Sequence, residues 1–542
     1  MRTWARGLVA ILAGLLGVTA LGGVPTASGA SSSGPKHGGS ITYALEAETA
    51  GGFCTMGNAQ LAPGGIEVVS AIYDTLTALN SKGQAVPYLA KSVTPNADYT
   101  QWTITLRPGI KFHDGEPLDA AAVKLNLDTS RGANPNVGAP LSTFVDQDIA
   151  SVSVVDPLTV LVQMHTPWPE YPYYLYGSGR SGIAAPAQLA STAVCPTKLI
   201  GTGPFELVEW VPNDHLTVKR NPNYWRPGLP YLDQIIFKPV TEAQSQINGL
   251  NGGDFNVIQT SSAANINALR DRKANGQGPE FDTDVGADVG YGLLNVKKPP
   301  FNDITARLAV AYAGDANQLN QIRNKGIETL ATGPFGPGTP YYLTFPQAHA
   351  AGLPHHDLAK AKQLVKQYEA AHNGQGISWE LLTVSDPELL ALSELVKQQQ
   401  ALAGINVTIT QVDQSTLINR VLGGEYNQAT FRNQPQDDPD TQYVWWHSGS
   451  PVNFSGFNDP VIDQDLEQGR VTTDPAKRIA IYRDLNRRFS SQVYELWSWY
   501  TRWAVGYTSN TGGIHGVPLP DGHGLPFPLF EGVLPVVGLY KK

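Results

Sequence analysis

The stretch that decides the fold spans residues 357–412 and reads DLAKAKQLVKQYEAAHNGQGISWELLTVSDPELLALSELVKQQQALAGINVTITQV. Asp357 is a good helix N-cap, and the apolar residues after it recur at helical spacing. They are Leu358, Ala361, Leu364, Val365 and Tyr368. The segment that follows, Ile377–Val384, is short and rich in residues that favour strands, so it predicts a strand.

A second helix and a second strand complete this stretch. Asp386 and Pro387 are typical of a helix start, and Gly404 is typical of a helix end. The apolar side of this helix is expected to carry Leu389, Leu392, Leu395, Val396 and Leu402. The last segment, Ile405–Val412, alternates apolar and polar side chains as a half-buried strand does. Strand, helix and strand in this order predict a βαβ unit.

Helices and strands are also predicted elsewhere along the chain. Tyr99–Leu106 alternates apolar and polar side chains, which predicts a half-buried strand. Asp474 is expected to start a helix that continues through Phe489, and the aromatic segment Tyr494–Tyr500 predicts the strand after it. The fold class is therefore expected to be α/β throughout.

Length and composition limit the classes of protein that fit this chain. With 542 residues, of which 42% are hydrophobic and 16% charged, it has the material for several packed domains. A disordered chain and a small disulfide scaffold are both excluded. The formal charge is −9 and the sequence has no long basic run, so no nucleic-acid partner is expected.

Residues 1–30 have the layout of a secretory signal peptide. Two arginines precede the uncharged segment Gly7–Val24, and the small residues Ser28–Ala30 suit a cleavage site. An uncleaved anchor is the alternative, because the apolar segment is just long enough to span a bilayer. We expect cleavage and an exported protein, located in the periplasm or elsewhere outside the cytoplasmic membrane.

The chain has two cysteines, Cys54 and Cys195, and both lie in the part expected to be exported. Thiols tend to be oxidised in that environment, so we predict that the two form a disulfide. Two separately buried thiols are the alternative. Neither cysteine lies near the end of the apolar segment, so a lipidated cysteine is not expected.

Motifs typical of enzymes are missing from the sequence. The segment 177–182, GSGRSG, lacks the spacing of a nucleophile elbow and predicts a loop. The segment 201–203, GTG, lacks the remaining residues of a nucleotide-binding loop and predicts a turn. We therefore expect no catalytic residues and no cofactor.

A bound metal ion is not expected either. His355 and His356 are chain neighbours whose side chains point apart, so they do not converge on one metal. The acidic residues Asp437, Asp438 and Asp440 lack the glycine and the distal glutamate of a calcium loop. A solvated turn or a ligand-facing loop is expected there instead.

Aromatic residues gather in three segments of the chain. They are Trp168, Tyr171, Tyr173 and Tyr174; Tyr443, Trp445 and Trp446; and Trp497, Trp499 and Tyr500. One such group alone is typical of a core, but three together favour a binding surface. Arg432, Asn433 and Gln434 lie beside the acidic residues and offer hydrogen-bonding groups. The pattern predicts a cleft for an extended organic solute.

Five segments, in order along the chain, resemble the family 5 extracellular solute-binding proteins of ABC importers, the group that binds dipeptides and oligopeptides. The segments are Ala71–Leu76 with Pro87–Ser92; Trp102–Leu118; Gly201–Phe205 with Arg220–Trp225; Pro300–Asp303 with Ala311–Asp315; and Asp357–Val365. The resemblance covers nearly all of the chain after the signal peptide.

The resemblance implies a periplasmic-binding-protein-like fold of the large cluster C type, in which two α/β lobes are joined by two hinge crossovers. After a flexible linker at 31–39, the first lobe would span 38–287 and contain an inserted subdomain. The second lobe would span 288–504, and 505–542 would return to the first lobe. The implied function is capture of a peptide or peptide-like solute between the lobes and its delivery to membrane permease subunits.

The resemblance also bears on how a peptide would be held. In peptide-binding members an Asp shortly before an acidic-Pro pair holds the α-amino group of the ligand. When that pair is matched to Asp438-Pro439, Pro435 stands at the position of this Asp. Either Asp437 or Asp440 would then hold the amine, or this anchoring of the amine would be absent.

Two further positions depart from the family pattern. Arg432 stands where the family has a ligand-contacting Trp, and Trp499 where it has a cleft Tyr. The residues expected to bind the ligand are Tyr291, Arg432, Asn433, Gln434, Asp437, Asp440, Trp445, Trp446, Trp497 and Trp499.

Three functions remain open on the sequence. The first is a monomeric receptor for peptides, and the second is the same receptor for an oligosaccharide, haem or a metal chelate. The third is a secreted hydrolase, which would need a nucleophile and a base that the sequence does not display.

Overall fold

The structure is a computed structural model that describes residues 34–49, 51–55, 61, 63–276, 280–284, 288–433, 438–527, 529 and 531–542. The predicted signal peptide and the first residues of the predicted linker lie outside these residues. Pro35–Lys542 packs as one unit, and the description below concerns that unit.

A seven-stranded mixed sheet is built from segments near both ends of the unit. Its order is β12 (Glu280–Thr283), β19 (Ala504–Tyr507), β11 (Val257–Thr260), β1 (Ser40–Leu45), β10 (Gln234–Pro239), β9 (His215–Arg220) and β8 (Phe205–Val211). Strand β1 pairs in parallel with both β10 and β11. Helix α1 (Pro63–Ile72) buries Ile66 and Val69 in the same core as Tyr43 and Phe237.

A four-stranded antiparallel sheet is inserted between β1 and β8. Its order is β4 (Ala90–Pro95), β5 (Gln101–Leu106), β7 (Thr159–Met164) and β6 (Ile149–Asp156). The alternation predicted over Tyr99–Leu106 is present, because Trp102, Ile104 and Leu106 are buried while the residues between them are half-buried. The associated elements are β2 (Thr77–Leu79), β3 (Ala85–Pro87), α2 (Ala120–Ser130), α3 (Pro140–Asp146), α4 (Tyr171–Tyr174) and η1 (Gly177–Gly179). We call these elements and the seven-stranded sheet with its helices the first lobe.

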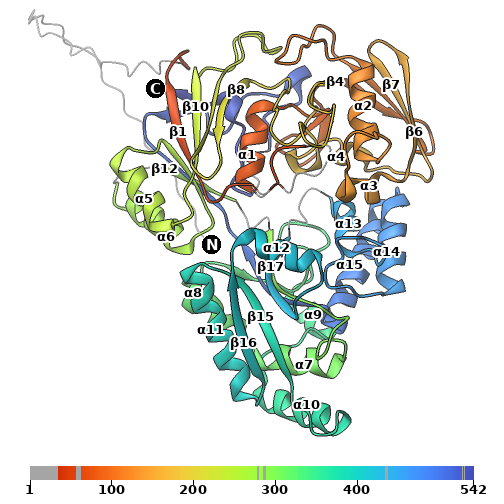
Figure 1. Cartoon of the computed structure of the whole chain (residues 1–542), viewed down its shortest axis with the longest axis vertical. Helices are drawn as coiled ribbons and strands as arrows, with labels where there is room; N and C mark the ends of the chain where they lie inside the picture. Colours follow the sequence, from red (N-terminus) through yellow and green to blue (C-terminus); the bar gives the residue numbers. More distant parts are fainter. Residues whose placement is uncertain are drawn as a thin grey trace, which may run out of the picture. The chain divides into compact units, whose positions relative to one another are not determined.

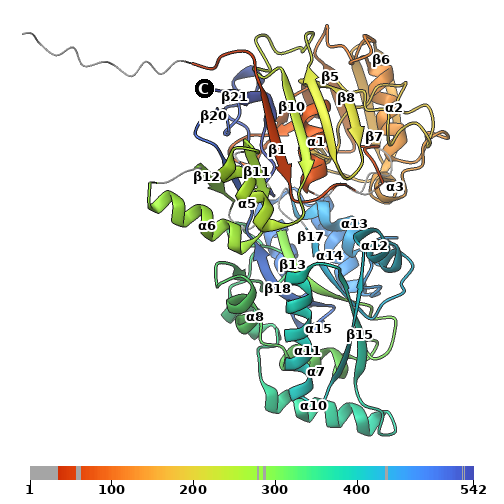
Figure 2. The same cartoon turned by 60° about the vertical axis from the view of Figure 1, so that its left-hand side comes forward.

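A six-stranded mixed sheet forms the centre of what we call the second lobe. Its order is β14 (Thr329–Leu330), β18 (Glu495–Thr501), β13 (Asp288–Leu294), β17 (Gln428–Asn433), β15 (Ser378–Val384) and β16 (Asn406–Val412). In Figures 1 and 2 its strands lie below those of the seven-stranded sheet. Its helices are α7 (Ile304–Ala313), α8 (Ala316–Arg323), α9 (Phe345–Ala350), α10 (Leu358–Ala371), α11 (Pro387–Leu402), α12 (Gln414–Leu422), α13 (Tyr443–Trp446), α14 (Pro460–Val471) and α15 (Pro475–Gln492).

The chain changes sheets twice, and the two passages are neighbours. It leaves the seven-stranded sheet after β12 and enters the six-stranded sheet at β13. It returns between β18 and β19, and these strands pair antiparallel with β13 and β12 respectively. Among the strands that the structure describes, the chain therefore passes between the two large sheets twice.

The predicted βαβ unit is present, and its helices begin where capping residues predict. Strands β15 and β16 pair in parallel on either side of α11 in the sequence. The Asp386 carboxylate accepts a hydrogen bond from the Leu389 backbone N–H at 2.8 Å, which starts α11. Asp357 starts α10 and Asp474 starts α15 by the same kind of bond. These boundaries follow from local chemistry that a sequence displays directly.

The remaining segments of the first lobe close its core. They are α5 (Ala243–Gly252), α6 (Ala263–Ala274), β20 (Thr511–Gly512), β21 (Tyr540–Lys541), η3 (Pro520–Gly522) and η4 (Val536–Gly538). The Leu534 backbone N–H donates to the buried Glu67 carboxylate on α1 at 3.0 Å. The GTG segment is the predicted turn, and a Cβ at Gly201 would lie 2.1 Å from the carbonyl oxygen of Ile72. That close approach explains the glycine.

Cys54 and Cys195 form the predicted disulfide. Their Cα atoms are 5.0 Å apart, and both side chains are buried. On the chain-entropy account, a bridge across 141 residues stabilises the folded state by about 5 kcal/mol.

Candidate functional site

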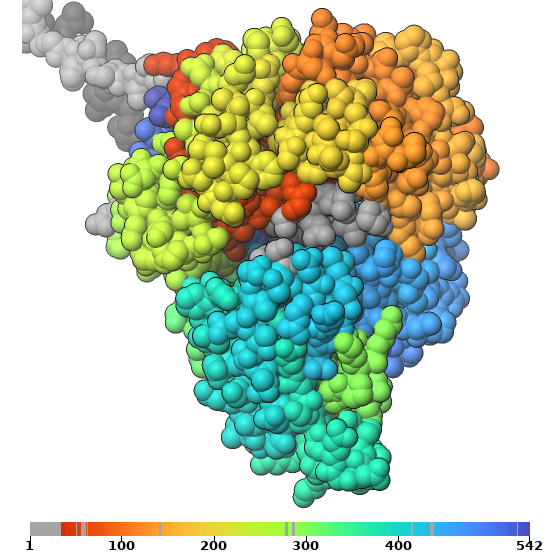
Figure 3. Space-filling view, in the orientation of Figure 1, coloured from red at the N-terminus to blue at the C-terminus, as the bar shows by residue number. Residues whose placement is uncertain are grey.

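A cavity of about 1290 Å³ lies between the two lobes. Figure 3 shows the hollow between the first lobe above and the cyan part of the second lobe below. Pockets for small organic ligands commonly measure roughly 300–1000 Å³, so this one has room for an extended solute.

Four acidic residues of the first lobe line the cavity, and Glu46 and Glu48 are two of them. Glu46 directly follows β1, and Glu48 lies two residues further along the chain. The carboxyl end of β1 lies beside that of its parallel neighbour β11, which Ser261 directly follows. The Glu46 carboxylate accepts hydrogen bonds from the Ser261 N–H at 2.7 Å and from its hydroxyl at 2.8 Å. Glu48 accepts from the indole N–H of Trp210 at 2.6 Å. The cavity therefore lies at the carboxyl ends of parallel strands, where α/β sheets commonly bind ligands.

The second lobe contributes aromatic residues from neighbouring strands. Tyr291 on β13 and Trp499 on β18 both line the cavity, and Gly290 lies opposite Trp499 in the sheet. Trp445 on α13 lines it as well, and its ring centroid lies 6.0 Å from that of Phe454. These rings give the wall flat apolar surfaces.

Arg432 on β17 connects the two lobes at the cavity. Its guanidinium donates to the Ser261 hydroxyl at 3.3 Å and to Glu46 at 3.5 Å, both in the first lobe. It lies 3.8 Å from the Asp288 carboxylate and 4.9 Å from the centroid of the Trp503 ring. Burial alone would lower the pKa of Arg432, but the carboxylates of Asp288 and Glu46 outweigh burial and raise it. Arg432 is therefore a charge-compensated part of the wall.

An aliphatic wall of the cavity comes from α11 and α12. It consists of Leu389, Leu392 and Val396 on α11 together with Leu417, Ile418, Val421 and Leu422 on α12. The apolar stripe predicted for α11 thus faces the cavity in part. The prediction that Leu402 belongs to the packed side of that helix is wrong, since this side chain is 62% exposed.

Five of the residues predicted to bind ligand line the cavity: Tyr291, Arg432, Asn433, Trp445 and Trp499. Gln434 and Asp437 lie outside the described residues, as does Pro435. Asp440, Trp446 and Trp497 are not among the lining residues.

Trp446 and Trp497 pack inside the second lobe. Trp446 is 2% exposed, and its ring centroid lies 5.1 Å from that of Phe489 on α15. Trp497 is half-buried, 5.2 Å from the Tyr291 ring and 5.8 Å from the Phe489 ring. Both residues therefore belong to the packing behind the aromatic wall, as the alternative of a core role anticipated.

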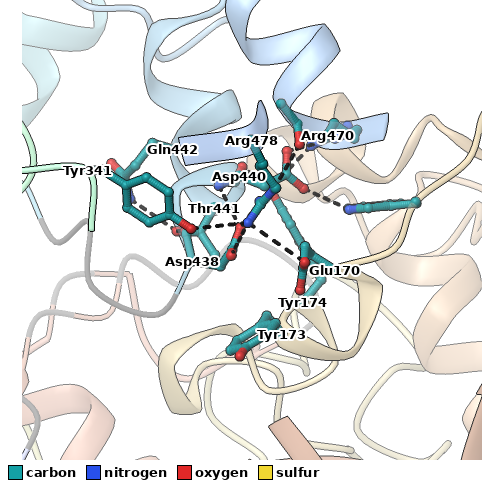
Figure 4. Close-up of polar contacts among 12 residues, drawn as sticks. Glu170, Tyr173, Tyr174, Tyr341, Asp438, Asp440, Thr441, Gln442, Arg470 and Arg478 are labelled. Atoms are coloured by element: carbon teal, nitrogen blue, oxygen red, sulfur yellow. Dashed lines mark hydrogen bonds and ion pairs between the residues drawn. The ribbon is translucent and has the colours of Figure 1, made fainter. Parts of the chain in front are cut away.

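Asp440 belongs to a buried ion-pair cluster between the lobes, which Figure 4 shows. Its carboxylate accepts from the Trp168 indole N–H at 2.7 Å and from Arg470 at 2.9 Å. The Tyr174 hydroxyl donates to its carbonyl oxygen at 2.5 Å. Since Asp440 is fully buried, its carboxylate is committed to protein partners and cannot hold a ligand amine in this arrangement.

A second ion pair completes this cluster. Asp438 binds Arg478 through both carboxylate oxygens, and Glu170 lies 3.7 Å from the same guanidinium. Burial raises the pKa of Glu170 to about 7; Asp438 adds to the rise and Arg478 opposes it. The prediction of a solvated turn is wrong for Asp438 and Asp440, because both are buried against arginines. The ion-pair cluster consists of Trp168, Glu170, Tyr174, Asp438, Asp440, Arg470 and Arg478.

Sequence reasoning missed several residues of the cavity wall, above all Glu46, Glu48 and Arg323. A signal for the first two was present, because polar residues directly after parallel strands gather at one sheet edge. Among the described residues, no group of three or more His, Cys, Asp or Glu side chains is arranged to hold a metal ion. Likewise, none of the helices in the described part of the chain is long and apolar enough to cross a membrane.

The profile described as "Bacterial extracellular solute-binding proteins, family 5 Middle" matches residues 84–455. The chain belongs to this family. The predictions of a solute-binding protein and of its two-lobed α/β fold class are thereby confirmed. Family 5 proteins act outside the cytoplasm.

Individual relatives agree with the family assignment. The glutathione-binding protein GsiB of Salmonella paratyphi A is 27% identical over 442 residues, which cover 77% of this chain and 81% of GsiB. The structure of the PBP AgaA from A. tumefaciens R10 with agropinic acid matches with a TM-score of 0.80 and 23% identity, covering 93% of this chain and 99% of AgaA. The oligopeptide-binding protein AppA of Bacillus subtilis, in complex with a nonapeptide, matches with a TM-score of 0.79 and 19% identity, covering 94% and 100%.

Proposed function

We propose that this family 5 protein is the receptor of an ABC importer for a peptide or peptide-like solute. The observation that carries the proposal is the cavity of about 1290 Å³, which both lobes line with aromatic, charged and aliphatic side chains. A short peptide presents matching groups, namely charged ends, backbone amides and apolar side chains. GsiB is named for binding glutathione, and the AppA structure holds a nonapeptide.

We further propose which residues contact the solute. The described candidates are Tyr291, Arg432, Asn433, Trp445 and Trp499, all of which line the cavity. Gln434 and Asp437 stay in the proposed set from the sequence alone. Asp440, Trp446 and Trp497 are left out, because their side chains are engaged by the protein itself.

The proposed cycle is capture between the lobes, hinge closure and delivery to membrane permease subunits. The proposed rigid parts are the first lobe, formed by 38–287 together with 505–542, and the second lobe, formed by 288–504. We also propose a cleaved signal peptide at 1–30, a monomer in solution and no turnover of the bound solute.

The test combines native mass spectrometry of freshly purified protein with calorimetric titration. The titrated probes are the dipeptide Met-Leu, glutathione, a pentapeptide, maltotriose, haem and a nickel–histidine chelate. Binding of one or more peptides with compaction in small-angle scattering is the expected result. Tight binding restricted to the sugar, haem or chelate would replace the peptide with a non-peptide solute. Recovery of hydrolysed peptide, abolished by a point substitution, would overturn the proposed absence of turnover.

A further inference from the structure

One part of the cavity borders the core of the subdomain inserted in the first lobe. Six apolar side chains of that core line the cavity, namely Leu76, Leu127, Val145, Ile149, Leu175 and Ile183. Val444 on α13 lines the cavity from the second lobe, and α3 packs against α13 there (Figure 1). We call this part of the cavity, with these seven residues as its apolar wall, the subdomain pocket.

Asp146, the last residue of α3, brings a carboxylate to the subdomain pocket. It lines the cavity and is only half-buried, so part of its surface remains accessible. Burial raises the pKa of Asp146 to about 6, and the Ser130 hydroxyl and the charge of Arg470 only partly oppose this rise. A carboxylate in apolar surroundings is unfavourable without a cation, so Asp146 is suited to an incoming positive charge.

Arg470 is the cation whose charge acts on Asp146, and it is already paired with another carboxylate. Its Nε–H donates to Asp440 at 2.9 Å, and its guanidinium carbon lies 3.9 Å from the centroid of the Tyr443 ring. The ion-pair cluster to which it belongs contains three carboxyl groups and two guanidinium groups. This cluster therefore carries no excess of positive charge that would repel a cation from Asp146.

Tyr171 on α4 is a second polar residue of the subdomain pocket. It lines the cavity, and its buried hydroxyl has no hydrogen-bond partner among the described residues. The charge of Asp146 contributes to raising the pKa of Tyr171, so the two groups are close enough to interact. Because the Tyr171 hydroxyl is covered, Asp146 is the group that a solute would reach first.

We propose that the subdomain pocket binds a basic side chain of the solute, with the terminal ammonium or guanidinium group at Asp146. This inference rests on the proposed function, and it adds the chemical class of one side chain to it. Lysine and arginine have apolar stems and charged ends, which match an apolar wall that carries one carboxylate. An uncharged apolar side chain would instead leave Asp146 desolvated without a partner.

The experiment compares matched lysine and norleucine peptides by titration calorimetry on the full-length protein. The probes are alanine tripeptides in which the first, second or third residue is replaced by lysine or by norleucine. Norleucine keeps an aliphatic chain and lacks the ammonium group. At the position whose side chain enters the pocket, the lysine peptide is expected to bind about 30-fold more tightly, because norleucine forms no charge-assisted hydrogen bond. Cadaverine, an aliphatic diamine, is the non-peptide probe.

Variants then assign the lysine preference to a residue. Asp146→Asn is expected to reduce the lysine-to-norleucine ratio of affinities to near one, because it removes the charge and keeps the shape. Asp146→Glu keeps the charge on a longer side chain and should leave an intermediate ratio. Asp98→Asn is the matched control, since Asp98 is exposed in the turn before β5 and is not among the lining residues. Circular dichroism and the thermal midpoint confirm that each variant is folded.

Each outcome decides the proposal. A lysine preference that disappears in Asp146→Asn and stays in Asp98→Asn supports it. Peptides that bind without a lysine preference at any position, or with a preference that persists in folded Asp146→Asn, overturn the basic-side-chain site and leave the peptide receptor standing. Asp146-dependent binding of cadaverine without peptide binding supports the site and overturns the peptide assignment. Absence of binding by every basic probe overturns the site.

Discussion

The cavity and the ion-pair cluster both lie where the two lobes meet, yet they differ in how completely their charged side chains are paired. In the cluster, Arg470 and Arg478 are surrounded by Asp438, Asp440 and Glu170, and nearly all of these groups are buried. In the cavity, open volume separates the walls and Arg323 keeps an unpaired donor. The difference suggests that one region fixes the contact between the lobes, whereas the other is left for a solute.

The largest expected effect comes from breaking the cluster at Arg470. Arg470→Leu leaves the Asp440 carboxylate buried without its cation, so the free energy of unfolding should fall by about 4 kcal/mol. Urea titration followed by circular dichroism measures the change. In a double-mutant cycle, the variant with both Asp440→Asn and Arg470→Leu should lose less free energy of unfolding than Arg470→Leu alone, because no carboxylate charge is left buried without a partner. A loss below about 1 kcal/mol for Arg470→Leu would contradict a structural role for this pair.

The next effect concerns binding and not stability. Trp499→Ala removes an aromatic surface of the cavity and should weaken binding by about 2 kcal/mol, or about 30-fold. Trp499→Phe keeps a flat ring and should lose less. Titration calorimetry with the peptide that binds the wild-type protein measures both. Unchanged affinity in folded Trp499→Ala would return this residue to a packing role.

A pH dependence distinguishes the two regions further. The folded-state pKa of Glu170 is about 7, above its ordinary value of 4.5, so the folded protein binds a proton here that the unfolded chain has released. The contribution of Glu170 to the free energy of unfolding therefore decreases progressively as the pH rises from about 4.5 to about 7. Glu170→Gln should therefore gain about 1–2 kcal/mol over the wild type across this window, a figure reduced because the side chain is 28% exposed.

Denaturant titrations of both proteins at pH 4.5, 6 and 8 measure this difference. Other buried carboxyl groups with raised pKa, such as Asp74, titrate in both proteins and cancel in the comparison. A constant difference between the two proteins across pH would show that Glu170 is not the titrating group.

The smallest effect tests the aliphatic wall. Leu389→Ala removes part of an apolar side chain that lines the cavity. It should weaken the binding of an apolar peptide by about 1 kcal/mol, or about fivefold. Leu402→Ala is the matched control on the same helix, since that leucine is 62% exposed and is not among the lining residues. Equal losses of affinity in both variants would mean that the substitutions act by destabilising α11 and not by removing a contact with the solute.

Much of the fold could be predicted from the sequence because its signals are local. Asp357 and Asp386 cap helices through backbone groups three residues away, and the alternation of Gln101–Leu106 shows directly in burial. The five segments that resemble the family added the arrangement of lobes, which no local pattern contains.

The candidate site was less predictable, because its partners are distant in the chain. Trp168 and Asp440 are 272 positions apart, so no short-range sequence pattern predicts that their side chains contact each other. An apolar helix face looks the same whether it meets a core or a cavity, and Leu389 on α11 shows this. Arg323 stands at a helix end whose sequence gives no sign that its donor is buried and unpaired.

The disulfide has a consequence for chain integrity. Cys54 and Cys195 enclose the whole four-stranded sheet, from β4 to β6 and β7, within one covalent ring. A protease that cuts once anywhere inside this ring opens it without releasing a fragment. The nicked protein would migrate as one band on a non-reducing gel and as two bands after reduction.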